Sequence, residues 1–141
     1  TGSLCKRLGV EENRALARPL LELYLKDDAL GDPIITEDHA LLFGWSTEEQ
    51  LAKIKDVSLT VNTLLTDYFA HLGIILVDFK LEFGVDGTGK LLLADEISPD
   101  TCRFWDAETK KKLDKDRFRK DLGDVLGAYR EIWRRVSEGS K

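Results

Sequence analysis

The chain has little of several residue types, and each shortage excludes a class of protein. It contains two cysteines and two histidines in 141 residues, too few for a disulfide framework or a histidine-based zinc site. Its apolar runs, such as Ile74–Val77, are far shorter than the roughly 20 residues that a membrane helix needs. Positive charge is not in excess either. The formal net charge is −5, which disfavours binding to a nucleic-acid backbone.

Methionine is absent altogether. Translated proteins begin with methionine, so its absence and the opening Thr1–Ser3 predict a segment of a longer protein. A natural terminus that was trimmed after translation is the alternative. The start of the chain has no basic stretch followed by an apolar one, as a secretion signal has. Together with cysteines that form no paired pattern, this predicts a cytoplasmic location.

The residues that are present are typical of a folded domain. Hydrophobic residues make up 43% and charged residues 33%, an ordinary balance for a globular protein. No repeat divides the chain, and no linker rich in glycine, proline or serine does so. Residues 1–141 are therefore predicted to form a single domain.

Periodicity and turn residues predict a mixed order of helices and strands. The predicted segments are a short helix up to Leu8, a strand over 19–25, a short helix over 36–43, a long helix from a Ser46–Glu49 capping box to Gly73, a hairpin of strands 74–83 and 90–97, and a last helix after Asp114. This order indicates an α+β fold in which helices flank an antiparallel sheet.

The hairpin contains the clearest candidate for chemistry. Side chains alternate along a strand, so Asp78, Lys80 and Glu82 share one face. If the turn is centred on Gly87–Thr88, Lys80 lies opposite Asp95, which then shares the face of Glu82. A register shift of one residue would reverse this. Two carboxylates that converge from adjacent strands suit Mg²⁺, whereas a solvated strand face with a surface ion pair is the alternative.

Two other features suit anions. The guanidinium of Arg103 could bind phosphate or carboxylate, or form a structural bridge to Asp100 or Asp106. Gly2–Ser3 resembles a helix start, whose N–H groups point outward towards an anion. Most helix starts bind only water, so that alternative stays open.

Taken together, several stretches of the chain resemble the SAICAR synthetase family. The match runs from Thr1 into the last helix, and its two most specific runs are Val77–Gly84 and Asp95–Asp106. The remaining matched stretches are Gly2–Gly9, Lys26–Pro33 and Asp114–Arg119.

The resemblance implies the C-terminal lobe of a two-lobed fold with a kinase-like ATP-binding half, whose N-terminal lobe is not in this chain. The implied activity is that of a carbon–nitrogen ligase of de novo purine biosynthesis. It joins carboxyaminoimidazole ribonucleotide (CAIR) and L-aspartate to give SAICAR, ADP and phosphate, with ATP and Mg²⁺. The implied partners are these small molecules, not nucleic acid or membrane, and a homo-oligomer is left open. The chain alone is expected to be inactive.

The resemblance also implies roles for individual residues. Lys80, Glu82 and Asp95 match catalytic positions, and Glu82 and Asp95 match the magnesium-associated acids. The other matched positions are Ser3 and Arg103 for the ribonucleotide phosphate, Asp32, Asp100, Lys115 and Arg119 in the substrate pocket, and Lys26 for the nucleotide. A catalytically silent ribonucleotide-binding module is the alternative function, and a general interaction domain is a third.

Overall fold

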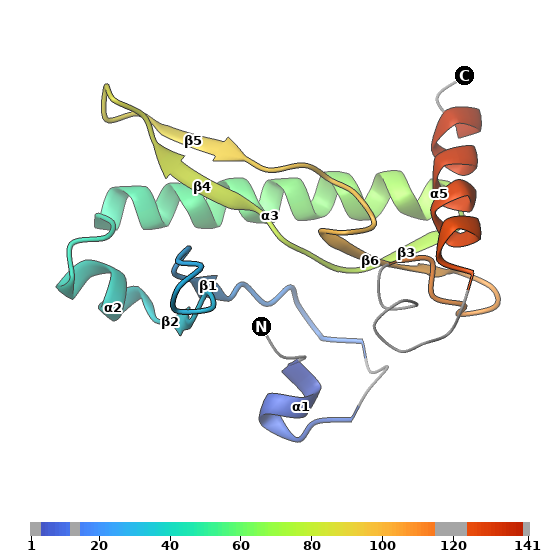
Figure 1. Cartoon of the computed structure of the whole chain (residues 1–141), viewed down its shortest axis with the longest axis horizontal. Coiled ribbons are helices and arrows are strands. Elements are labelled where there is room, and N and C mark those ends of the chain that lie inside the picture. The colour runs from blue at the N-terminus through green and yellow to red at the C-terminus, as the bar shows by residue number, and fades with distance from the viewer. Residues whose placement is uncertain (1–3, 12–14, 115–123, 140–141) are drawn as a thin grey trace. The chain divides into compact units, whose positions relative to one another are not determined.

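The structure, a computed structural model, describes residues 4–11, 15–114 and 124–139. Helices and antiparallel strand pairs make up the chain (Figure 1), which confirms the predicted α+β class. The chain divides into two compact units, Thr1–Leu59 and Thr60–Lys141. The helix over Glu48–His71 contains the boundary between the two units, so they are joined by a continuous helix and not by a linker. The single domain therefore stays a prediction. Within the described ranges, no helix is long and apolar enough to cross a membrane.

The first unit is built from short elements. It contains α1 (Leu4–Leu8), the strands β1 (Leu23–Tyr24) and β2 (Ile34–Ile35), α2 (Glu37–Leu42) and the start of α3 (Glu48–His71). β1 and β2 pair antiparallel. The predicted strand over 19–25 is therefore only two residues long. A strand extends only as far as its partner can supply hydrogen bonds, and here the partner is as short.

Helix α2 begins at a side-chain cap. Thr36 Oγ1 accepts a hydrogen bond from the N–H of His39 at 3.2 Å, and His39 Nδ1 accepts one from the N–H of Thr36 at 3.2 Å. Gly44 follows α2 with a φ of 69°, a left-handed conformation that glycine adopts readily. These contacts confirm the short helix predicted over 36–43.

The capping box of α3 is one residue later than predicted. The N–H of Gln50 donates to Thr47 Oγ1 at 3.2 Å, and the N–H of Thr47 donates to Gln50 Oε1 at 3.0 Å. Both Ser46–Glu49 and Thr47–Gln50 fit the sequence pattern of such a box. The Ser46 hydroxyl instead donates to Gln50 Oε1 at 3.2 Å, so the predicted box is wrong.

The second unit contains the rest of α3 and two separate strand pairs. The elements after α3 are β3 (Ile74–Phe79), β4 (Glu82–Val85), β5 (Leu91–Ala94), β6 (Cys102–Asp106) and α5 (Val125–Gly139). β3 pairs antiparallel with β6, and β4 with β5. The single strand predicted over 74–83 is thus wrong: it is two strands with different partners. The N–H of Lys80 still donates a hydrogen bond to Thr101 O at 2.9 Å, next to the β3–β6 pair. From Glu82 onward the chain pairs with β5 instead.

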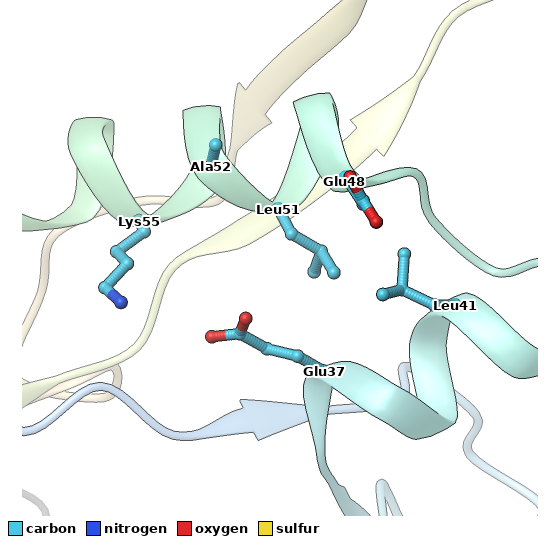
Figure 2. Close-up of a pocket in the computed structure, with 6 residues that line it drawn as sticks. All are labelled: Glu37, Leu41, Glu48, Leu51, Ala52 and Lys55. Atoms are coloured by element: carbon cyan, nitrogen blue, oxygen red, sulfur yellow. The ribbon is translucent and has the colours of Figure 1, made fainter.

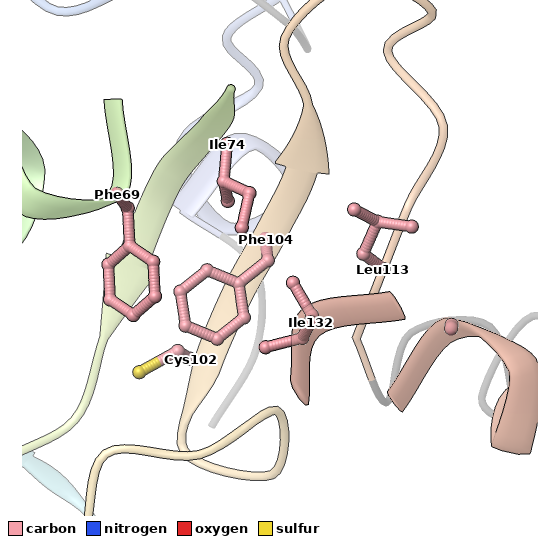
Figure 3. Close-up of a cluster of buried hydrophobic side chains, with 7 residues drawn as sticks. Phe69, Ile74, Cys102, Phe104, Leu113 and Ile132 are labelled. Atoms are coloured by element: carbon pink, nitrogen blue, oxygen red, sulfur yellow. The ribbon is translucent and has the colours of Figure 1, made fainter. Parts of the chain in front are cut away.

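The core of the second unit lies between its helices and the β3–β6 pair. Figure 3 shows the buried side chains, which are Phe69, Ile74, Cys102, Phe104, Leu113, Ala128 and Ile132. The ring centroids of Phe69 and Phe104 are 4.5 Å apart. Asp114 is fully buried among them, and its Oδ2 accepts a hydrogen bond from the N–H of Phe104 at 2.8 Å. A buried carboxylate needs such a donor.

The last helix is described only from Val125 onward. The part predicted over 115–123 lies outside the described residues. On α5 the buried side chains are Ala128 and Ile132, and the half-buried Tyr129 and Val136 also pack against the core. Leu126 and Trp133, which the sequence places among the apolar positions of this helix, are instead 70% and 72% exposed.

Candidate functional site

The turn of the β4–β5 hairpin sets its register. Asp86 Oδ1 accepts hydrogen bonds from the N–H groups of Thr88 at 2.8 Å and Lys90 at 3.0 Å. Gly89 has a φ of 87°, as expected of a three-residue loop that ends in a left-handed residue. The hairpin is therefore centred on Thr88, and Glu82 lies opposite Ala94. The predicted register is wrong by one residue.

In this register a regular strand would point Asp95 away from Glu82. Asp95 instead leaves β5 with a φ of 77°, a left-handed conformation that costs a non-glycine residue about 1–2 kcal/mol. Lys80 Nζ lies 2.7 Å from Glu82 Oε1 and 2.9 Å from Asp95 Oδ2. The three charged groups therefore meet as predicted, although the backbone of Asp95, and not strand alternation, brings them together.

The contacts within this cluster favour the charged forms of Lys80 and Asp95. Hydrogen bonds to Glu82 and then to Asp95 raise the pKa of Lys80 above its usual range. The bond from Lys80 is the main cause that lowers the pKa of Asp95, with the N–H of Glu96 adding to it. The Lys80 side chain is 56% exposed, so the cluster adds little to stability. Its main property is a local arrangement of charge.

The two carboxylates fit a magnesium ion in type and number of donors. Mg²⁺ is usually bound through one or two carboxylates, with substrate phosphates and water as further ligands. Glu82 and Asp95 already share one cation, the ammonium of Lys80. The described part of the chain contains no cluster of three or more histidine, cysteine or acidic side chains suited to a metal. A metal here would therefore need oxygen ligands from its substrate.

Arg103 has a partner that the sequence did not suggest. It lies opposite Asp78 in the β3–β6 ladder, and its Nη1 donates to Asp78 Oδ2. Asp100 accepts a hydrogen bond from the hydroxyl of Tyr129 at 3.0 Å, and Asp106 Oδ2 pairs with Arg135 at 2.6 Å. A guanidinium has five donors in a planar fork, so one Arg side chain can bind a carboxylate and a phosphate together.

Lys26 and Asp32 lie in one loop of the first unit, which Asp27 organises. Asp27 Oδ1 accepts hydrogen bonds from the N–H groups of Ala29 at 3.0 Å and Leu30 at 3.1 Å, and its own N–H donates to Asp32 Oδ1 at 2.9 Å. Lys26 Nζ is 3.7 Å from Asp32 Oδ1. The role of Asp27 was missed, although aspartate before turn residues is a known signal for such a loop.

The predicted site residues are divided between the two units, apart from three that the structure does not describe. Ser3, Lys115 and Arg119 lie outside the described residues. Lys80, Glu82, Asp95, Asp100 and Arg103 belong to the second unit, and Lys26 and Asp32 belong to the first. The site roles of all of them stay predictions.

The mixed fold and the cluster of charges define a class of protein, an α+β protein with a lysine held between two carboxylates at the base of a hairpin. A sequence model of SAICAR synthetase matches residues 1–136. The chain belongs to the SAICAR synthetase family. Two curated relatives have the name phosphoribosylaminoimidazole-succinocarboxamide synthase. That of Desulfitobacterium hafniense strain Y51 is 60% identical over 137 residues, and that of Deinococcus deserti is 58% identical over 137 residues.

Solved structures agree with this. A SAICAR synthetase (type 2) in complex with ADP is 55% identical, with a TM-score of 0.90 over 98% of this chain and 59% of that one. The type-1 structure of SAICAR synthetase from Pyrococcus horikoshii OT3 is 54% identical, with a TM-score of 0.89 over 98% of this chain and 60% of that one. The matches with the two curated relatives include 97% of this chain but only 57% and 58% of the relatives' own lengths. The chain therefore spans a little over half of each relative.

Proposed function

We propose that this chain supplies the substrate- and magnesium-binding part of an ATP-dependent carbon–nitrogen ligase. The reaction joins CAIR and L-aspartate to give SAICAR, ADP and phosphate in de novo purine biosynthesis. The observation that carries the proposal is the meeting of Glu82 and Asp95 on Lys80 in a chain of this family. The ADP in a related structure supports ATP as a substrate.

Such a ligation needs the CAIR carboxylate to be activated by phosphoryl transfer, after which the aspartate amine displaces phosphate. The protein's part is mainly to position the reactants and to neutralise charge. Glu82 and Asp95 would hold Mg²⁺, which neutralises charge on the phosphoryl oxygens when bound. Lys80 keeps the two carboxylates together and adds an ammonium beside them.

The other predicted residues have roles in the same proposal. Arg103, oriented by Asp78, binds the phosphate of the ribonucleotide, and Asp100 lies three residues earlier, in the loop before β6. Asp32 contacts substrate and Lys26 contacts the nucleotide. Ser3, Lys115 and Arg119 complete the predicted set. The partners are small molecules, and a cytoplasmic location fits a metabolic ligase.

A hybrid protein tests the proposal. This chain would replace the matching region of the Desulfitobacterium hafniense relative, with which it is 60% identical. The hybrid should form SAICAR from CAIR, L-aspartate and ATP, and should form none when any one of the three is left out. The chain by itself should show no turnover.

Two outcomes would decide against the proposal. A hybrid that is folded by circular dichroism and inactive, beside an active unmodified relative, would contradict the ligase role. A folded hybrid that binds CAIR without turnover would support the silent binding module, for which the comparisons give no support. Turnover by the chain alone would contradict the expectation that it is only part of the catalytic unit.

A further inference from the structure

The hollow between helices α2 and α3 contains none of the predicted site residues. Figure 2 shows this space of about 220 Å³, which lies in the first unit. The predicted residues of the second unit are held by hydrogen bonds instead. One of these bonds comes from a residue without an assigned role, Tyr129 of α5, whose hydroxyl donates to Asp100 Oδ1 at 3.0 Å.

The loop between β5 and β6 carries Asp100 and keeps its shape by its own hydrogen bonds. Thr101 Oγ1 donates to Glu96 O at 2.7 Å and accepts from the N–H of Ser98 at 3.1 Å. The N–H of Cys102 donates to Ser98 O at 2.9 Å, and the N–H of Asp100 donates to Ser98 Oγ at 3.2 Å. The backbone of Asp100 is therefore fixed within the loop, without the bond from α5.

Tyr129 adds control over the side chain of Asp100. Tyr129, Ile132 and Val136 are three and four residues apart, so they lie on one face of α5, and this face packs against the core. Packing therefore holds the half-buried ring of Tyr129, while its hydroxyl meets the exposed Asp100. A hydrogen bond to Oδ1 restricts the rotation of the carboxyl group. A carboxylate can accept about four hydrogen bonds, so this one leaves capacity for a substrate.

Asp100 lies close in sequence to the predicted phosphate ligand. Only Thr101 and Cys102 separate it from Arg103, so the Cα atoms of Asp100 and Arg103 are at most about 11 Å apart. In the proposed function Arg103 binds the phosphate of CAIR. The same ligand carries sugar hydroxyl groups and an amino group, which donate hydrogen bonds to a carboxylate. CAIR is therefore the substrate whose donors Asp100 is best placed to meet.

We propose that Tyr129 is a positioning residue that orients the carboxylate of Asp100 towards the hydrogen-bond donors of CAIR. The inference rests on the proposed function and adds α5 to the parts of the fold that support the site. Loss of the Tyr129 hydroxyl lets the carboxylate turn away from the ligand, so CAIR binds more weakly. An interaction that is equally strong in the bound substrate and the transition state changes KM and not kcat.

Steady-state kinetics of the hybrid protein test the inference. Tyr129→Phe removes only the hydroxyl and should raise KM for CAIR about three- to ten-fold. Both kcat and KM for ATP should stay within about two-fold of the unsubstituted hybrid. Tyr68→Phe is the matched control, because it removes the same group from the same unit. The Tyr68 hydroxyl forms no hydrogen bond with a described residue, so the control should keep the original KM.

A double-mutant cycle shows whether Tyr129 acts through Asp100. Asp100→Ala should raise KM for CAIR by more than Tyr129→Phe does. The double variant should lie within about two-fold of Asp100→Ala alone, because the hydroxyl has no carboxylate left to orient. Losses that add up in the double variant would show that Tyr129 acts independently of Asp100 and would overturn the inference.

Urea unfolding separates positioning from a structural tie. A Tyr129→Phe hybrid that is less stable but keeps the original KM for CAIR would overturn the inference and leave the ligase reaction intact. A folded hybrid without turnover contradicts the proposed function instead, and calorimetry with CAIR then tests Tyr129. Weaker CAIR binding in Tyr129→Phe supports the inference, whereas equal affinities overturn it. A folded hybrid that binds no CAIR contradicts both.

Discussion

The two compact units differ in how much of their apolar surface they bury. Among the described residues, the buried apolar side chains of the first unit are Ala40 and Leu51, whereas the second unit buries the whole cluster around Phe104. The first unit is held by helix caps, two-residue strands and loop hydrogen bonds. The second has longer strand pairs, one of which, β3–β6, packs on the core. We therefore expect the first unit to open locally before the second does.

A substitution in the core should break the second unit and give the largest effect. Phe104 is 1% exposed and packs against Phe69. Phe104→Ala should lower the free energy of unfolding by about 3–5 kcal/mol, measured by urea unfolding. Leu42→Ala, at an exposed position of the first unit, should change it by less than about 0.5 kcal/mol. Equal losses for the two variants would contradict the contrast between the units.

Substitutions in the cluster of Lys80, Glu82 and Asp95 should give the largest losses of activity. In an active hybrid, Glu82→Gln and Asp95→Asn should each lower kcat by about 10²–10³-fold, because shape is kept and charge is lost. The measurements are steady-state kinetics and the Mg²⁺ dependence of the rate. Glu49→Gln, which removes an exposed carboxylate from α3, is the control and should keep full activity. Wild-type kcat in either cluster variant would refute its proposed catalytic role.

Arg103 should act on binding, with an effect smaller than that of the cluster. In the hybrid, Arg103→Ala should weaken CAIR binding about ten- to hundred-fold and leave ATP binding nearly unchanged, as measured by calorimetry with each ligand separately. Asp78→Asn should give a smaller loss, because the guanidinium stays but loses the carboxylate that orients it. Unchanged CAIR affinity in Arg103→Ala would leave Arg103 with a structural role only.

Acid should destabilise the second unit through the contacts of Arg135. Its guanidinium donates to Asp106 Oδ2, Glu131 Oε1 and Gly73 O. Hydrogen bonds from Arg134 and then Arg135 lower the pKa of Glu131 to about 2. Bonds from Thr109, and then from Arg135, lower the pKa of Asp106 below its usual range.

The lowered pKa values of Asp106 and Glu131 mean that acid reduces the stability of the folded chain. A carboxyl whose pKa is lower in the folded chain stabilises it fully above the unfolded pKa, about 4, and loses this contribution as pH falls towards the folded pKa. Urea unfolding should therefore show stability falling from about pH 5 towards pH 2. Asp106→Asn should cost about 1.5–2 kcal/mol at pH 7 and flatten this dependence. A pH profile identical to wild type would contradict the role of Asp106.

Loss of a helix cap should give the smallest effect and should be confined to the first unit. Thr36→Ala removes the oxygen that accepts the N–H of His39, at a cost of about 1 kcal/mol. Hydrogen exchange should become faster around α2 and stay unchanged around β3 and β6. Thr36→Ser keeps the oxygen and should behave as wild type. Faster exchange across both units would contradict independent local opening.

Local signals were sufficient to predict the helix ends. Thr36, Gly44 and Gly73 act on residues within a few positions of themselves, so the helices over 36–43 and up to Gly73 were predicted correctly. The same is true of the turn at 86–89 as the centre of a hairpin. Two of the errors are shifts of one residue, in the capping box at Thr47 and in the hairpin register, where two neighbouring alternatives satisfied the same pattern.

The chain by itself determined which charged residues are available, where the helices end and where the hairpin turns, because caps and turns form hydrogen bonds over three or four residues. The tertiary structure decided which strand pairs with which. β3 joins β6 and not β5, so the predicted strand over 74–83 is divided and Arg103 meets Asp78 across 25 positions. It also decided the left-handed backbone at Asp95 that completes the cluster with Lys80. Contacts between distant segments depend on packing against a shared core, which no short sequence pattern encodes.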